Sequence, residues 1–268
     1  MPAWLGGNVN AAGIKWIASF PGNLARDIRR AHSVTVLNDT ATGIPTAIIN
    51  TPLVSGIRTA SVSGFVLDQY LRVNNRTGLK CGIIGLGPIG QLHLEMLQQC
   101  FGARIEQFFL YDLLPILPKV TALADHKDKI VICKSWQDVY EQSDLLFTCT
   151  VSKERYIDTL PRPGGIYFNV SLRDFQPAFL QAIDLHAVDS WVEICRENTD
   201  IEKASLAFGL ARTDVLEIAD LAEPGRLAGP SNRSFMFNPM GMAIYDIAVG
   251  KYFYDLAVQH HQLIELED

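Results

Sequence analysis

Residues 81–90 read CGIIGLGPIG, and this stretch decides the fold. Gly85, Gly87 and Gly90 form a GxGxxG pattern directly after an apolar run and directly before a helical one. The first glycine permits a tight turn, the second lets the backbone approach a pyrophosphate, and the third allows the helix to pack closely on the strand. The stretch therefore predicts the strand, turn and helix that open a dinucleotide-binding unit.

An acidic residue follows at the distance that such a unit requires. Asp112 ends the next apolar run, QFFLYD, where its carboxylate would accept hydrogen bonds from the ribose hydroxyls of the adenosine. The same carboxylate would repel a 2′-phosphate, so the sequence favours NAD over NADP. A flavin site and a degenerate turn that binds nothing are the alternatives.

Outward from the turn, apolar runs alternate with helical patterns. The runs are apolar along their whole length, as is typical of parallel strands that are covered on both faces. We therefore expect an α/β fold with a Rossmann-type doubly wound parallel sheet. The expected strands are residues 81–84, 107–111, 130–133, 145–150, 165–170 and 185–189, with helices at 88–100, around 115–124 and from 136.

The two ends of the chain follow another pattern. Residues 13–19 and 33–38 read as strands, and the turn signal DTATG joins the second of them to a strand at 45–50, which predicts a hairpin. Helical spacing follows at 52–71 and again at 240–266, after a strand-like run at 234–238. We expect a smaller, discontinuous α+β domain for substrate binding and dimerisation, residues 1–62 and 236–268, and an NAD-binding domain, residues 63–235.

Composition narrows the class of protein. The net charge is −6, with 48% hydrophobic and 19% charged residues and no basic run, which excludes nucleic acid as an expected partner and favours a small-molecule ligand. The apolar runs are too short to span a bilayer, so we expect a cytoplasmic protein that makes no use of a membrane. Five cysteines without a CxxC pattern and six unpaired histidines predict buried thiols and no metal site.

Three residues outside the turn are candidates for chemistry. Lys15 lies between apolar neighbours in GIKWIAS, where it either meets an anion or points to solvent. Arg58 in SGIRTAS either offers its planar fork to a carboxylate or makes a surface salt bridge. Asp174 follows the strand GIYFNV, where it either reaches the cofactor crevice or caps the helix that begins near Pro177.

Six motifs in fixed order resemble one family. They are GIKW, NDTATGIP, IRTAS, IIGLGPIG, FNVSLRD and FNPMGMAIYDI. This arrangement, which covers about residues 13–256, resembles the ornithine cyclodeaminase and mu-crystallin family. The motifs GIKWIAS, LND, TCTVS and NPMGMAI are most similar to the branch that makes L-2,3-diaminopropionate for siderophores and peptide natural products.

The resemblance implies roles for single residues. Lys15 and Asp174 would be catalytic, and Lys15 and Arg58 would bind the substrate carboxylates, with Arg173 as a third candidate cation. It also implies a homodimer, and that relatives carry a further segment upstream. We therefore expect either an internal start or a shortened protein that lacks its usual N-terminal segment.

The cofactor contacts extend beyond the three glycines. We expect Pro88 and Ile89 of the turn, and Thr150 of TCTVS, to contact the NAD together with Gly85, Gly87, Gly90 and Asp112.

The resemblance also implies an activity on a small amino-acid substrate. The expected reaction is the NAD-dependent oxidative hydrolysis of N-[(2S)-2-amino-2-carboxyethyl]-L-glutamate to L-2,3-diaminopropionate and 2-oxoglutarate. Two alternatives share the fold: a redox-neutral ornithine cyclodeaminase that forms proline and ammonia, and a non-catalytic NAD(P)H-binding protein of the mu-crystallin kind.

Overall fold

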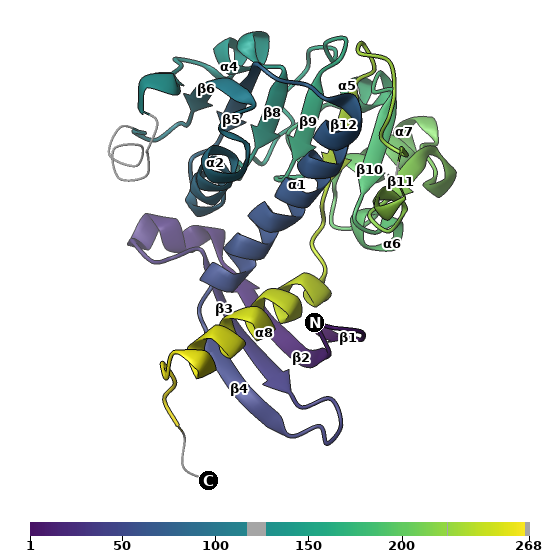
Figure 1. The fold of residues 1–268 in the computed structure, drawn as a ribbon. Coiled ribbons are helices and arrows are strands. Elements are labelled where there is room, and N and C mark those ends of the chain that lie inside the picture. Colours follow the sequence, from purple (N-terminus) through teal and green to yellow (C-terminus); the bar gives the residue numbers. More distant parts are fainter. Residues whose placement is uncertain (117–126, 224, 266–268) are drawn as a thin grey trace. The chain divides into compact units, whose positions relative to one another are not determined.

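A computed structural model describes residues 1–116, 127–223 and 225–265 (Figure 1). The chain forms two compact units, which are described separately here: unit 1 is Met1–Thr59 with Gly241–Asp268, and unit 2 is Ala60–Met240. The helix expected around residues 115–124 lies almost entirely outside the described residues. The predicted domain limits, at residues 62 and 236, lie within a few residues of the limits of these units. The assignment of each part as a functional domain stays a prediction.

Unit 2 contains a parallel sheet in the order β11-β10-β12-β9-β8-β5-β6-β7. The order reverses direction at β5, and helices cover the sheet, so the predicted doubly wound α/β class is confirmed (Figure 1). The strands are β5 Leu79–Ile84, β6 Ile105–Tyr111, β7 Ile130–Ile132, β8 Leu145–Thr148, β9 Ile166–Asn169, β10 Leu185–Val188, β11 Val215–Glu217 and β12 Phe235–Asn238.

The core of unit 2 lies between this sheet and its helices. Every residue of β8, β9, β10 and β12 is buried, which explains why these strands are apolar throughout. Phe147 on β8 stacks on Phe168 on β9 with ring centroids 4.5 Å apart. Burial of each such side chain stabilises the fold by about 1.5–3 kcal/mol. The packed strands therefore hold the loops at their carboxyl ends in place.

The helices of unit 2 begin at local signals. α4, Trp136–Gln142, has a capping box between Ser135 and Asp138, and α7, Asp200–Phe208, begins after Thr199, whose hydroxyl accepts from the backbone N–H of Glu202. The remaining ones are α2 Pro88–Phe101, α5 Pro177–Gln181, α6 Trp191–Ile194 and the short turns η2 Lys127–Lys129, η3 Arg212–Asp214 and η4 Asp220–Ala222.

Unit 1 contains an antiparallel sheet in the order β1-β2-β3-β4. Its strands are Pro2–Leu5, Ala11–Ser19, Ala31–Asn38 and Pro45–Asn50, with a short turn η1 at Pro21–Arg26, and the predicted hairpin is β3 with β4. Helix α8, Ala243–Gln259, packs on one face of this sheet. A Cβ on Gly13 would lie 2.2 Å from the Val36 carbonyl oxygen and 2.9 Å from the Ile247 side chain, so only glycine allows this packing.

Helix α1, Leu53–Asn74, runs from unit 1 into unit 2. Several other elements differ from expectation. The short strands β1 and β11 and the helices α6 and α7 have no strong periodic pattern and were not predicted. The tail helix covers 243–259 rather than 240–266, because Gly241 has a φ of +89°, outside the helical region, and the last helical turn ends at His260.

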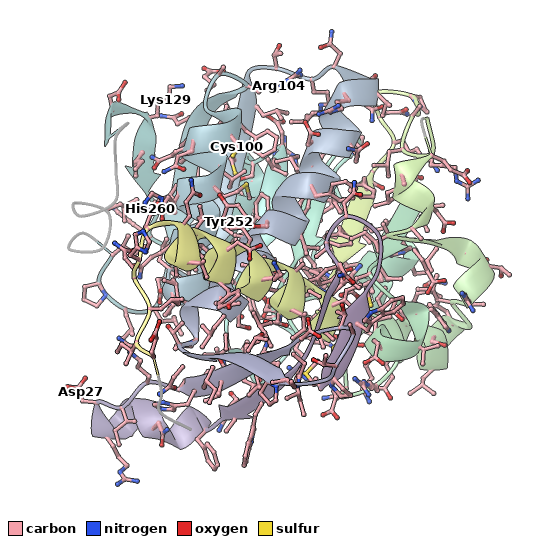
Figure 2. All side chains as sticks on the ribbon, turned by 60° about the horizontal axis from the view of Figure 1, so that its bottom comes forward. Asp27, Cys100, Arg104, Lys129, Tyr252 and His260 are labelled. Carbon is pink, nitrogen blue, oxygen red and sulfur yellow. The ribbon has the colours of Figure 1, made fainter. Side chains whose placement is uncertain are left out.

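Two absences and the state of the cysteines bear on function. Among the residues that the structure describes, no helix is long and apolar enough to cross a membrane, and no three or more metal-binding side chains gather. All five cysteines are free thiols, of which Cys100 on α2 is exposed (Figure 2).

Candidate functional site

The glycine turn has the geometry that a pyrophosphate needs. Gly85 has a φ of +93°, which a residue with a side chain rarely adopts, and its N–H donates to the Tyr111 carbonyl at 2.8 Å. A Cβ on Gly90 would lie 1.9 Å from the Gly85 carbonyl oxygen, so the helix reaches the strand only with glycine there. Apart from the two chain neighbours of Gly87, no described residue has an atom within 4 Å of where its Cβ would stand, which leaves the backbone open to a ligand.

The residues present fit the phosphates of a dinucleotide. Helix α2 begins with Pro88, and its N-cap Gly87 provides no side-chain hydrogen bond, so the N–H groups and the dipole of the first turn are available to an anion. The Ile89 carbonyl accepts from His93 Nδ1 at 2.8 Å in the next turn. This part of the predicted cofactor site rests on backbone, as the sequence pattern requires.

Asp112 lies at the carboxyl end of β6, where the ribose is expected. Its Oδ2 accepts from the Leu86 N–H at 2.7 Å, and its Oδ1 accepts from the Leu114 N–H at 3.0 Å. The carboxylate therefore ties the end of β6 to the glycine turn, and the turn holds it in one orientation.

Asp174 lies in the loop after β9 and is fully buried. Its Oδ1 accepts from the Thr150 hydroxyl at 2.6 Å, and its Oδ2 accepts from the Ser171 hydroxyl. Burial raises the pKa of Asp174 above its usual range, although these hydrogen bonds act in the opposite direction. The helix-cap interpretation is wrong, because α5 begins after Gln176 and no side chain caps it.

Thr150, which was predicted to contact the cofactor, lies in the loop after β8. The start of this loop lies beside the glycine turn in space, since the Cys149 N–H donates to the Ile84 carbonyl at 2.8 Å. The structure brings Thr150 to Asp174, so its cofactor contact stays a prediction.

Lys15 and Arg58 meet on one carboxylate within unit 1. Lys15 Nζ donates to Asp246 Oδ1 and to Ser55 Oγ, both at 2.8 Å, and Arg58 Nε donates to the same Asp246 oxygen at 3.3 Å. The side chains are 2%, 12% and 1% exposed for Lys15, Arg58 and Asp246. The solvent-facing interpretation of Lys15 and the surface salt bridge of Arg58 are therefore wrong.

A buried cation, Lys15, and a mostly buried one, Arg58, share one anion in this cluster. Burial lowers the pKa of Lys15, the Arg58 charge lowers it further, and Asp246 opposes both. Asp246 Oδ2 has no hydrogen-bond partner among the described residues. The cluster thus has one more positive than negative group, which suits a ligand carboxylate, and one oxygen left to accept a ligand N–H.

Glycine in the NPMG motif makes room for the guanidinium. A Cβ on Gly241 would lie 2.3 Å from one terminal nitrogen of Arg58. Because Gly241 has no side chain, the Arg58 guanidinium can lie against its backbone. Sequence reasoning missed Ser55 and Asp246; the run FNPMGMAIYDI contains Asp246, but its partners precede it by 231 and 188 residues.

Arg173 contacts a neighbouring loop, and its role as a third candidate cation stays a prediction. Its Nε and one terminal nitrogen donate to the Glu197 carbonyl at 3.2 and 2.7 Å. The structure therefore assigns Arg173 to the support of a neighbouring loop.

A parallel doubly wound sheet with this glycine turn and with Asp112 after the next strand defines a dinucleotide-binding protein of the Rossmann class. The chain belongs to the ornithine cyclodeaminase/mu-crystallin family, whose family model matches residues 1–261, and this confirms the resemblance inferred from the motifs.

Named relatives agree with that assignment. The chain is 30% identical to an N-((2S)-2-amino-2-carboxyethyl)-L-glutamate dehydrogenase of Staphylococcus aureus, over 97% of this chain and 79% of the relative. It is 26% identical to an alanine dehydrogenase of Archaeoglobus fulgidus, over 96% of this chain and 80% of the relative. In fold it resembles the Δ1-pyrroline-2-carboxylate reductase of Thermococcus litoralis, solved with NADH and L-proline, with a TM-score of 0.82, 24% identity and coverage of 97% and 82%.

Proposed function

We propose that the protein is an NAD-dependent dehydrogenase that cleaves N-[(2S)-2-amino-2-carboxyethyl]-L-glutamate to L-2,3-diaminopropionate and 2-oxoglutarate. The observation that carries the proposal is the buried cluster of Lys15, Arg58 and Asp246, whose excess positive charge suits an amino-acid carboxylate. The similarity to the staphylococcal dehydrogenase supports the choice of substrate, which has three carboxylates.

NAD is the proposed cofactor. When bound, it would supply the acceptor for a hydride from the glutamate α-carbon of the substrate, which would leave the secondary amine as a protonated imine. Backbone N–H groups at the start of α2 would hold the pyrophosphate, and Asp112 would accept from the ribose hydroxyls. Relatives of similar fold bind NADH or NAD, among them an archaeal alanine dehydrogenase with a TM-score of 0.80 and 21% identity.

Asp174 is the proposed acid and base of the hydrolytic step. Water adds to the imine carbon, and the resulting carbinolamine collapses when its nitrogen gains a proton and its hydroxyl loses one, which releases ketone and amine. A carboxyl group whose pKa is raised by burial holds a proton more readily than an exposed one, so it can give the proton as well as take it. Lys15 and Arg58 would hold the substrate through its carboxylates.

The test is the appearance of NADH. The protein is incubated with NAD⁺ and N-(2-amino-2-carboxyethyl)-L-glutamate, and in parallel with L-ornithine, L-alanine and L-proline. NADH together with 2-oxoglutarate from the first substrate alone supports the proposal. Proline from ornithine without net NADH supports the cyclodeaminase instead, and cofactor binding without turnover supports a binding protein.

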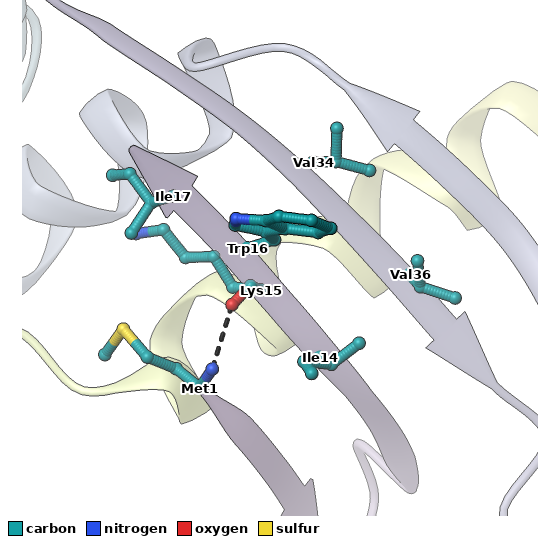
Figure 3. A pocket seen from close by; sticks show the side chains of 7 residues that line it. All are labelled: Met1, Ile14, Lys15, Trp16, Ile17, Val34 and Val36. Carbon is teal, nitrogen blue, oxygen red and sulfur yellow. Dashed lines mark hydrogen bonds between the residues drawn. The ribbon is translucent and has the colours of Figure 1, made fainter. Parts of the chain in front are cut away.

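We further propose that a second copy of the chain covers the outer face of the unit 1 sheet. Lys15, Thr35 and Leu37 are buried on one face, while Trp16 at 78% and Ile48 at 60% are exposed on the other. Figure 3 shows a hollow on that outer face, lined by side chains of β2 and β3 around Trp16 and by Met1, whose amino group donates to the Lys15 carbonyl at 3.0 Å. An apolar face of this kind is typical of an interface.

The similar alanine dehydrogenase is described as a dimer, which supports the choice of partner. Replacement of Trp16 by Asp should convert a dimer to a monomer in analytical ultracentrifugation; a wild-type monomer would contradict the proposal.

A further inference from the structure

The turn that carries Asp174 is held under strain by groups outside it. Leu172 has a φ of +66°, a left-handed conformation that costs an ordinary residue about 1 kcal/mol or more. Its N–H donates to Asn169 Oδ1 at 2.9 Å, and its carbonyl accepts from the Asp200 N–H at 2.7 Å. The conformation persists because both polar groups of Leu172 are bound on either side.

The Asp200 carboxylate holds the next two residues of the turn. Its Oδ2 accepts from the backbone N–H groups of Asp174 and Phe175, both at 3.1 Å, and from Asn169 Nδ2 at 2.9 Å. Asp200 is 1% exposed, so water does not replace these bonds. One side chain therefore receives donors from three residues around the candidate acid and base.

Arg155 fixes Asp200 in turn. Its Nε donates to Asp200 Oδ1 at 2.6 Å, and a terminal nitrogen donates to the Asn198 carbonyl at 2.6 Å. The loop of Arg155 is paired with the same turn, because the Ile157 N–H donates to the Asp174 carbonyl at 2.9 Å. Both backbone groups of Asp174 are thus bound, one to Asp200 and one to Ile157.

We infer that Asp200, held by Arg155, is a positioning residue that fixes the 172–175 turn and so keeps the Asp174 carboxyl on the hydroxyls of Thr150 and Ser171. This inference rests on the proposed function, which makes Asp174 the acid and base. No atom of Asp200 needs to touch the substrate. Loss of Asp200 would free the turn, and Asp174 would lose the two hydrogen bonds that favour its ionised form.

The test compares Asp200→Asn with Asp144→Asn. The asparagine at 200 has an NH₂ group that cannot accept from Arg155 or from the backbone donors. Asp144 makes a bond of the same kind, since its Oδ2 accepts from the Lys80 N–H at 3.0 Å, but at the amino end of the sheet. It therefore controls for the loss of a carboxylate that accepts from backbone.

Two readouts separate positioning from general stability. Amide hydrogen exchange in residues 172–175 should become at least about tenfold faster in Asp200→Asn and stay unchanged in Asp144→Asn. In turnover of the proposed substrate, kcat should fall by about tenfold or more in Asp200→Asn, and the acidic limb of its pH profile should move to higher pH. The binding of NADH, followed by its fluorescence, should stay unchanged.

Each result decides the inference. Unchanged exchange in the turn, or faster exchange with an unmoved limb, overturns it. Wild-type protein without turnover contradicts the proposed function, while the exchange comparison still tests whether Asp200 holds the turn. If Asp200→Asn does not fold, Arg155→Gln at a partly exposed position should give the same two changes in smaller measure.

Discussion

Two buried aspartates, one in each unit, have opposite surroundings. Asp246 in unit 1 accepts from two cations, Lys15 and Arg58, whereas Asp174 in unit 2 accepts from two hydroxyls, those of Thr150 and Ser171. A cation stabilises a carboxylate as a fixed anion, while neutral donors offset burial only in part. The comparison suggests that unit 1 supplies fixed charge for binding and unit 2 supplies a group that exchanges protons.

The largest effect is expected for Asp174→Asn. The amide has nearly the same shape but cannot pass a proton, so kcat should fall by about 10²- to 10⁴-fold, the usual contribution of a general acid or base. The affinity for NADH should stay within a factor of about two, because the glycine turn is untouched. Steady-state kinetics and NADH fluorescence measure the two quantities.

A second variant disturbs the surroundings of Asp174 and keeps its carboxyl group. Thr150→Val removes one hydroxyl donor to Asp174 but leaves the carboxyl in place, so it should retain part of the turnover. Full turnover in Asp174→Asn would remove this residue from the mechanism and break the contrast between the two aspartates.

The second effect concerns the binding cluster. Lys15→Met leaves Asp246 buried with Arg58 as its remaining cation, and the free energy of unfolding should fall by about 3 kcal/mol, as is usual when a buried ion pair loses one partner. A triple variant, Lys15→Met, Arg58→Met and Asp246→Leu, removes every charge of the cluster, so it should recover most of this loss, yet show no turnover. Urea denaturation and the NADH assay measure both.

Recovery is the informative result. It would show that the cluster serves substrate binding and not folding, whereas an equally unstable triple variant would make the cluster a structural element.

The two clusters also differ in how far the sequence predicted them. The glycine turn and Asp112 were predicted because every determinant lies within two consecutive strands and the turn and helix between them. Asp174 was located by its place after a strand, and Lys15 and Arg58 by the resemblance. Asp246 and Asp200 were missed: Asp246 bonds to residues about two hundred positions away, and Asp200 lies in a helix, α7, whose short pattern gave no signal.

The third effect is a pH dependence of stability. Burial raises the pKa of Asp200 to about 6, above its unfolded value near 3.9. A raised carboxyl pKa stabilises the fold fully below the unfolded value, and that contribution, about 2–3 kcal/mol, is lost as the pH rises through about 6. Asp200→Asn lacks this titration, so its deficit in unfolding free energy should be larger near pH 4 than near pH 7.

Chemical denaturation at several pH values gives this difference. A deficit that is independent of pH would mean that Asp200 has the same pKa in the folded and unfolded protein. The contrast between a proton-exchanging unit 2 and a charge-fixing unit 1 would then rest on Asp174 alone.

The smallest effect tests the backbone half of the cofactor site. Gly87 has a φ of −66°, which alanine adopts readily, and among the described residues other than its chain neighbours none would meet the added methyl group. Gly87→Ala should therefore fold with nearly wild-type stability, while the methyl group obstructs the pyrophosphate and raises the NADH dissociation constant by about tenfold, or 1.4 kcal/mol. Gly90→Ala is the contrasting variant, because its methyl group would lie 1.9 Å from the Gly85 carbonyl oxygen and should destabilise the fold itself. Equal NADH affinity in Gly87→Ala and wild type would mean that the dinucleotide does not approach this residue, and the NAD site would have to be sought elsewhere.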